Sequence, residues 1–90
     1  MSAYRSNGGT LVSLKEVRLK PGWQPLLLLQ DEKVKCFVDL MQKDCEFAPI
    51  QVEEKEGGFY IVLDGHHRFV ASHQCSFTHI PVDITPALSL

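Results

Sequence analysis

The residue types best suited to chemistry follow one another at positions 64–68, Asp-Gly-His-His-Arg. An apolar run at residues 59–63 comes before them and a helical pattern begins at residue 66, so they mark a junction between a strand and a helix. The first backbone N–H groups of a helix have no acceptor inside it, and together with the helix dipole they attract anions. The junction therefore predicts a phosphate site.

Each residue of the junction has a predicted role in such a site. Gly65 and the amides that follow it cradle the phosphate, and Arg68 clamps it with two hydrogen bonds. His66 and His67 donate hydrogen bonds, and His66 is also suited to proton transfer. A carboxylate beside phosphate is repulsive unless it holds a divalent cation or accepts a proton from a hydroxyl group. Asp64 is therefore expected to be a metal ligand or a general base, and a triphosphate fits the site best.

A simpler interpretation exists for each residue taken singly. Asp64 is then a helix cap, Arg68 a surface cation and His67 a core histidine bonded to a carbonyl group. A cap explains one residue of the five, whereas an anion site explains all of them together. The clustering favours the anion site.

The helices that would position this junction are indicated by the spacing of apolar residues. Positions 34, 37, 38 and 41 are apolar at the i, i+3, i+4, i+7 spacing of a helix face, which predicts a helix over residues 32–43 with Asp31 as its N-cap. A second helix is expected over residues 66–75. The junction therefore opens the second helix.

Strand patterns occupy most of the remaining chain. Short strands are expected at residues 11–14 and 17–19, and a hairpin with strands at 49–53 and 59–63 is expected around Gly57-Gly58. The second hairpin strand is apolar on both faces, which predicts an interior position, whereas Pro81 suggests that a last strand at 80–84 lies at an edge. Strands and helices mixed with a hairpin indicate the α+β class.

Length and charge restrict the kind of protein. Ninety residues with 44% hydrophobic content predict one domain, placed at residues 11–90 after a flexible lead at residues 1–10. A net charge of -2 does not favour a broad electrostatic grip on nucleic acid or anionic lipid. The longest apolar run, residues 26–29, is far shorter than the roughly 20 residues of a membrane span, so a soluble cytoplasmic protein without membrane contact is expected.

The three cysteines, Cys36, Cys45 and Cys75, are widely spaced and form no Cys-x-x-Cys pair. This arrangement fits neither a disulfide framework nor a zinc knuckle. Reduced thiols are expected.

The chain resembles the ParB/sulfiredoxin superfamily. The match rests on Asp-Gly-His-His-Arg-Phe-Val-Ala at residues 64–71, followed by a short helix and Ile-Pro-Val at 80–82. Trp-Gln-Pro at 23–25 is similar to the Gln-Pro loop of ParB N-terminal domains, residues 33–44 to the sulfiredoxin helix, and Ala-Pro-Ile at 48–50 to the start of the family's hairpin. The resemblance covers almost the whole domain and implies a small mixed sheet with two main helices.

The resemblance also implies a ligand, which is ATP, CTP or ADP with Mg²⁺, and it adds Lys33 as the family's nucleotide-contacting lysine. Sulfiredoxin reduces a sulfinic acid with a Gly-Cys-His-Arg motif. His67 and Arg68 match that motif, but His66 stands in place of its reactive cysteine. An imidazole cannot form the thiosulfinate of that reaction, so this activity is not expected. Cys36 is an alternative nucleophile, but a role in packing is favoured for an isolated cysteine on a helix.

Two further relatives shape the expected function. ParB has Gly-Glu-Arg-Arg at this position, binds CTP and continues into a helix-turn-helix. No such element follows before Leu90, so direct sequence-specific DNA reading is not expected. The Asp-Gly-His-x-Arg version is more similar to free-standing members, including an ADP-dependent free-serine kinase, in which a carboxylate acts as base. Asp64, Glu16 and Glu32 are candidates for that base.

Two functions therefore stay open. The first is a domain that binds a nucleotide or another phosphorylated small molecule, and for which phosphotransfer and nucleotide hydrolysis both stay open as activities. The second is a non-catalytic interaction module with a protein partner in a plasmid, phage or nucleoid system. The residues do not decide whether the chain is an enzyme.

Overall fold

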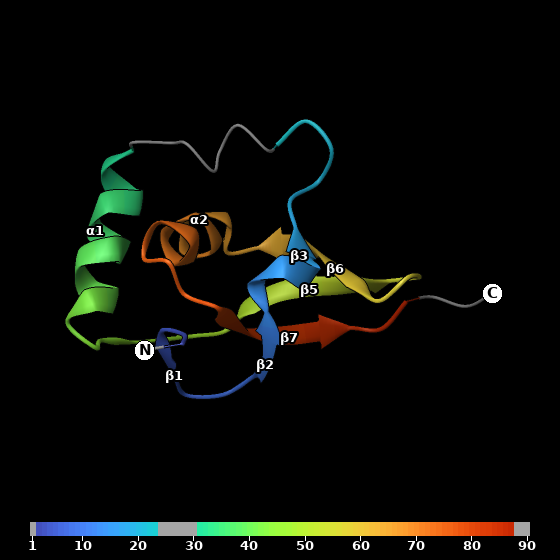
Figure 1. Cartoon of the computed structure of the whole chain (residues 1–90), viewed down its shortest axis with the longest axis horizontal. Helices are drawn as coiled ribbons and strands as arrows, with labels where there is room; N and C mark the ends of the chain where they lie inside the picture. Colours follow the sequence, from blue (N-terminus) through green and yellow to red (C-terminus); the bar gives the residue numbers. More distant parts are fainter. Residues whose placement is uncertain (1, 24–30, 88–90) are drawn as a thin grey trace.

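The computed structural model describes residues 2–23 and 31–87 of the chain (Figure 1). Two helices and a curled mixed sheet confirm the α+β class expected from the sequence. In chain order the elements are β1 (Arg5–Ser6), β2 (Thr10–Ser13), the 3-10 helix η1 (Leu14–Glu16), β3 (Val17–Arg18), α1 (Glu32–Gln42), β4 (Glu46–Phe47), β5 (Ile50–Lys55), β6 (Phe59–Asp64), α2 (His66–Gln74) and β7 (His79–Thr85).

The main sheet has the strand order β2-β7-β5-β6-β3. The expected hairpin is the antiparallel pair β5 and β6, and β6 lies inside the sheet as predicted because β3 pairs with its other side. The edge position suggested by Pro81 is wrong. Strand β7 lies between β2 and β5, with Pro81 opposite Leu11. This pairing joins distant parts of the chain, so no local sequence pattern predicts it.

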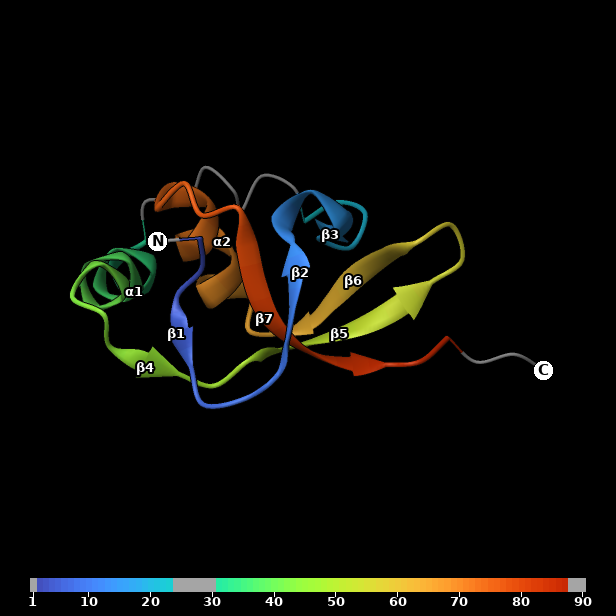
Figure 2. The same cartoon turned by 60° about the horizontal axis from the view of Figure 1, so that its bottom comes forward.

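Both helices form where the sequence predicts them, within one residue at their ends. The Asp31 side chain caps α1 by accepting hydrogen bonds from the amides of Lys33 at 2.6 Å and Val34 at 3.3 Å. Helices α1 and α2 lie side by side at one end of the sheet (Figures 1 and 2). In the described residues, no helix is both long and apolar enough to cross a membrane.

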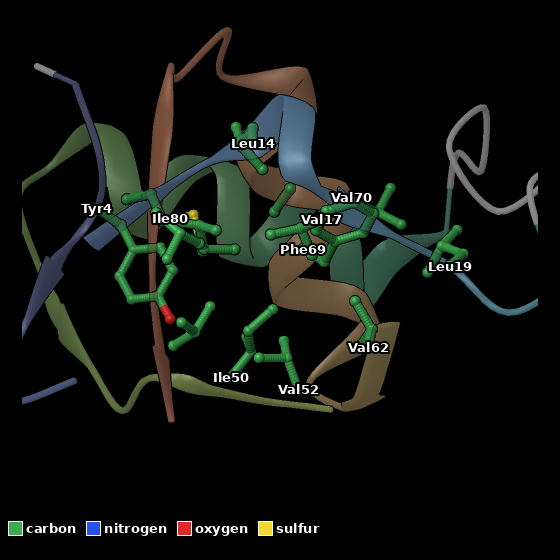
Figure 3. Packing of buried hydrophobic residues seen from close by; sticks show 14 of the residues in the cluster. Tyr4, Leu14, Val17, Leu19, Ile50, Val52, Val62, Phe69, Val70 and Ile80 are labelled. Carbon is green, nitrogen blue, oxygen red and sulfur yellow. The ribbon is translucent and has the colours of Figure 1, made fainter. Parts of the chain in front are cut away.

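The core lies between α2 and the sheet (Figure 3). Phe69 and Val70 on α2 are each 1% exposed, and they pack in one cluster with inward residues of the central strands, among them Ile50 and Val62, both 0% exposed. Each such side chain contributes about 1.5–3 kcal/mol when fully buried. This packing fixes the direction of α2 and so the place of its first turn.

Residues 2–6 pack against the domain, although the sequence predicts a flexible lead at residues 1–10. Tyr4 is 2% exposed and meets the Phe47 ring edge-on, with ring centroids 6.0 Å apart. Strand β1 pairs in parallel with β4, and the amides of Thr78 and His79 donate to the carbonyl of Ser2 at 2.9 and 2.8 Å. A two-residue strand is too short to show a periodic pattern, so the sequence did not reveal it.

Candidate functional site

The junction between β6 and α2 turns at Gly65. Gly65 is the N-cap of α2, with a left-handed φ of +94°, and it provides no side-chain cap. A Cβ atom at this position would lie 2.6 Å from Cγ2 of Ile50. Both the conformation and the close approach of β5 therefore require glycine. The alternative in which Asp64 is the helix cap does not hold, because Gly65 is the N-cap.

The first helical hydrogen bond of α2 runs from the Phe69 amide to the Gly65 carbonyl at 3.0 Å. The amides of His66, His67 and Arg68 precede that bond, so the helix itself offers them no acceptor. They lie at the positive end of a nine-residue helix. This end of α2 can bind an anion.

The predicted site residues meet in one pocket of about 370 Å³. Lys33 comes from the first turn of α1, and it reaches the pocket because the two helices pack side by side. Phe37, one turn further along α1, adds an aromatic wall that the sequence analysis did not assign to the site. The full lining is Lys33, Phe37, Asp64, Gly65, His66, His67 and Arg68.

His67 joins the starts of the two helices. Its Nε2 atom lies 3.9 Å from Oδ2 of Asp31, and the His67 side chain is 40% exposed. The same Asp31 carboxylate caps α1. The alternative of a core histidine bonded to a carbonyl group therefore does not describe His67, because its ring is partly exposed and faces a carboxylate.

His66 stacks on Trp23, with ring centroids 4.5 Å apart and planes inclined by 36°. Its Nε2 atom is buried and has no hydrogen-bond partner within residues 2–23 and 31–87. Burial lowers the pKa of His66 below its ordinary value, the charges of Lys20 and His67 act in the same direction, and Asp64 opposes them. His66 is therefore predominantly neutral at pH 7, a state that can donate or accept one proton.

Arg68 has a structural partner as well as a place in the pocket. Its Nη1 atom donates to the carbonyl oxygens of Ala48 at 2.5 Å and Pro49 at 3.3 Å. The Tyr4 hydroxyl donates to the same Ala48 oxygen at 2.8 Å. Burial raises the pKa of Tyr4 to about 12, and the nearby positive charge of Arg68 opposes that rise. The simple surface-cation alternative for Arg68 is thus wrong, and the sequence alone did not reveal its link to the N-terminal segment.

The turn at residues 20–23 brings Trp23 against His66 of the site. The amide of Trp23 donates to the Lys20 carbonyl at 3.0 Å, and Gly22 has a φ of +89°. Pro21 at the second position and glycine with positive φ at the third are typical of a type II turn. The contact between Trp23 and His66 joins distant parts of the chain, so no local sequence pattern predicts it. Gln24 and Pro25 of the Trp-Gln-Pro match lie outside the described residues.

The other candidate groups lie apart from this pocket. Within the described residues, neither Glu16 nor Glu32 lines it, and Cys36 is an exposed free thiol that does not line it either. Burial raises the pKa of the Cys75 thiol, which faces the Val38 carbonyl at 3.9 Å. No group of three or more His, Cys, Asp or Glu side chains in the described part of the chain is arranged to hold a metal ion.

The fold and this junction define the class of protein. The chain belongs to the ParB N-terminal domain family, whose model matches residues 2–88. No curated protein matches it.

Solved structures with the same fold differ in what they bind. Sulfiredoxin from Arabidopsis thaliana is 24% identical with a TM-score of 0.69, over 87% of this chain and 86% of that one. ParB from Caulobacter crescentus complexed with CTP-gamma-S is 16% identical with a TM-score of 0.70, over 92% and 47%. A free serine kinase in complex with AMP is 15% identical with a TM-score of 0.66, over 92% and 33%. This chain therefore spans about half of that ParB and a third of the kinase.

Proposed function

We propose that this chain binds the phosphate groups of a nucleotide at the start of α2. The observation that carries the proposal is the pocket itself, in which the first turn of α2, whose amides have no acceptor inside the helix, meets Lys33 from a different helix. A helix dipole, amides without an acceptor inside the helix and a nearby cation all favour an anion. The nucleotides bound by structures of the same fold support this choice over a non-catalytic interaction module.

Each side chain has a distinct role in the proposed complex. Lys33 supplies a point charge, and the neutral His66 ring in the pocket wall can donate to a phosphate oxygen or accept from a hydroxyl group. Both carbonyl bonds of Arg68 use Nη1, so those two bonds leave other N–H groups of the guanidinium for the ligand. His67 donates from the part of the pocket nearest the start of α1, where its Nε2 atom lies 3.9 Å from Asp31.

Mg²⁺ fits this site only together with the nucleotide. Asp64 is the single carboxylate among the lining residues of the described structure. Mg²⁺ is commonly held by one or two carboxylates with the remaining ligands from phosphate oxygens and water. Asp64 therefore serves as metal ligand in our proposal, and when phosphate is transferred Asp64 or His66 is the candidate to accept the proton of the attacking hydroxyl group or water.

The test measures nucleotide binding by thermal shift and titration calorimetry with ATP, CTP and ADP, each with and without Mg²⁺. At a ligand concentration 100 times Kd, the melting temperature should rise by about 10–20 °C for a domain of this size. Lys33→Ala should weaken binding. Lys35→Ala is the matched control, because Lys35 lies on the same helix, is exposed and pairs with Glu32.

Two results would count against the proposal. The first is the absence of any shift with all three nucleotides in the presence of Mg²⁺, which favours the interaction module. The second is an equal loss of affinity in Lys33→Ala and Lys35→Ala, which shows that the pocket is not where the phosphate binds.

A further inference from the structure

A large aromatic side chain stands exposed beside the pocket. Trp23, the single tryptophan of the chain, is 43% exposed. One side of its indole is occupied by the His66 ring at 4.5 Å, and His66 lines the pocket. The exposed part of the indole therefore offers an apolar, π-rich surface next to the proposed phosphate site.

The local backbone holds this indole in place. Leu19, 4% exposed, anchors the chain in the core, and the turn closed by the Trp23 amide and the Lys20 carbonyl follows at once. Pro21 fixes one turn dihedral, and Gly22 takes the positive φ that the turn requires. A surface that is ordered before binding loses less entropy when a ligand arrives.

Phe37, the other aromatic residue at the pocket, is less available. Its ring is only partly exposed and packs edge-on against Phe47, with centroids 5.4 Å apart. It forms part of the wall and is joined to the core. Trp23 is therefore the better surface for a flat group of the ligand.

We infer that the nucleotide of this site carries a purine base, which stacks on the exposed face of Trp23 while its phosphates bind the start of α2. This inference rests on the proposed function. A nucleotide joins base and phosphate through one ribose, so a phosphate beside His66 brings its base close to Trp23, the ring against which His66 stacks. A purine covers more of an indole than a pyrimidine does, so stacking favours adenine or guanine.

The experiment compares ligands that share phosphate groups but differ in the base. Affinities of ADP, CDP and pyrophosphate, all with Mg²⁺, are measured by calorimetry on the full chain. We expect ADP to bind more tightly than CDP. Trp23→Ala should weaken ADP binding by about 5- to 150-fold, the range found for loss of one base stack, and should change pyrophosphate binding by less than about twofold. ADP should also quench the fluorescence of the single tryptophan.

Three further variants separate stacking from folding. Trp23→Phe keeps a ring and should retain most of the ADP affinity. Gly22→Ala places a Cβ where no heavy atom lies within 4 Å, but strains the positive φ, so it should weaken ADP and spare pyrophosphate. Leu11→Ala removes another exposed apolar side chain, 58% exposed on β2, and should change neither affinity.

The outcomes distinguish this inference from the function on which it rests. If pyrophosphate binds but ADP binds no more tightly than CDP, the stacking inference is overturned and the phosphate site stands. The same conclusion follows if pyrophosphate binds and ADP affinity is equal in the wild type and Trp23→Ala. An equal loss of ADP and pyrophosphate affinity in Trp23→Ala also overturns it, because Trp23 then only supports the fold. No binding of any of the three ligands refutes both.

Discussion

Replacing Arg68 by alanine tests whether this side chain holds the site together. The change removes the Nη1 bonds to the Ala48 and Pro49 carbonyls at 2.5 and 3.3 Å. Hydrogen bonds that involve a charged group are worth about 1.5–3 kcal/mol, and the longer bond adds little to the shorter one. Ala48 keeps the Tyr4 hydroxyl as a donor, so its carbonyl is not left without a partner. We therefore expect a loss of about 1.5–3 kcal/mol of unfolding free energy.

The assay is urea unfolding of the ligand-free chain, followed by circular dichroism. The matched control is Arg18→Ala, whose guanidinium lies 4.4 Å above the Phe59 ring and should cost only about 0.5–1 kcal/mol. In a double-mutant cycle, Tyr4→Phe and Arg68→Ala should be non-additive by at least about 0.5 kcal/mol, because both donors share one oxygen.

The result that would refute this reasoning is a stability of Arg68→Ala equal to that of Arg18→Ala, combined with additive effects in the cycle. Arg68 would then be an ordinary surface cation. If instead Arg68→Ala is destabilised but still binds ADP like the wild type, Arg68 holds the Ala48–Pro49 segment and does not contact the phosphate.

Four further outcomes are expected. Because the pKa of Tyr4 is raised to about 12 in the folded state, its contribution to stability is complete below pH 10 and is lost as pH rises from about 10 to 12, so alkaline unfolding of Tyr4→Phe should show a weaker pH dependence over that interval. Gly65→Ala should destabilise the chain by about 2–4 kcal/mol in urea unfolding, from the left-handed conformation and the clash with Ile50, and wild-type stability would contradict this. The pKa of His66 is lowered by burial and a bound phosphate favours its protonated form, so ADP affinity should rise as pH falls below about 6.5; calorimetry with His66→Ala should lose that rise, and superimposable profiles would remove His66 from the site. An assay with overoxidised peroxiredoxin, ATP, Mg²⁺ and thiol should show no reduction, whereas recovery abolished by Cys36→Ser would prove that another thiol acts in place of the missing cysteine.

The sequence by itself determined the features that depend on neighbouring residues. Helix α1 follows from the apolar spacing at positions 34, 37, 38 and 41 and from the capping side chain of Asp31. The strand, glycine and helix at residues 59–74 also follow from neighbouring residues. The apolar run at 59–63 favours a strand, and Gly65 permits the backbone turn that leads into the helix. The residues at 64–68 that we propose to bind phosphate are contiguous, so local geometry alone brings them to one place.

Only the tertiary structure decided which distant residues join them. Trp23 stacks on His66, and Tyr4 shares a carbonyl with Arg68, across gaps of more than 40 residues in the chain. Such contacts depend on how the apolar faces of α2 and the sheet are buried together. The hydrophobic effect is non-directional, so a local sequence pattern does not specify which distant residues meet. The pairing of β2 with β7 arises in the same way. The neighbours of the site were therefore fixed by the packing of the whole domain, and the junction at Gly65 by the chain itself.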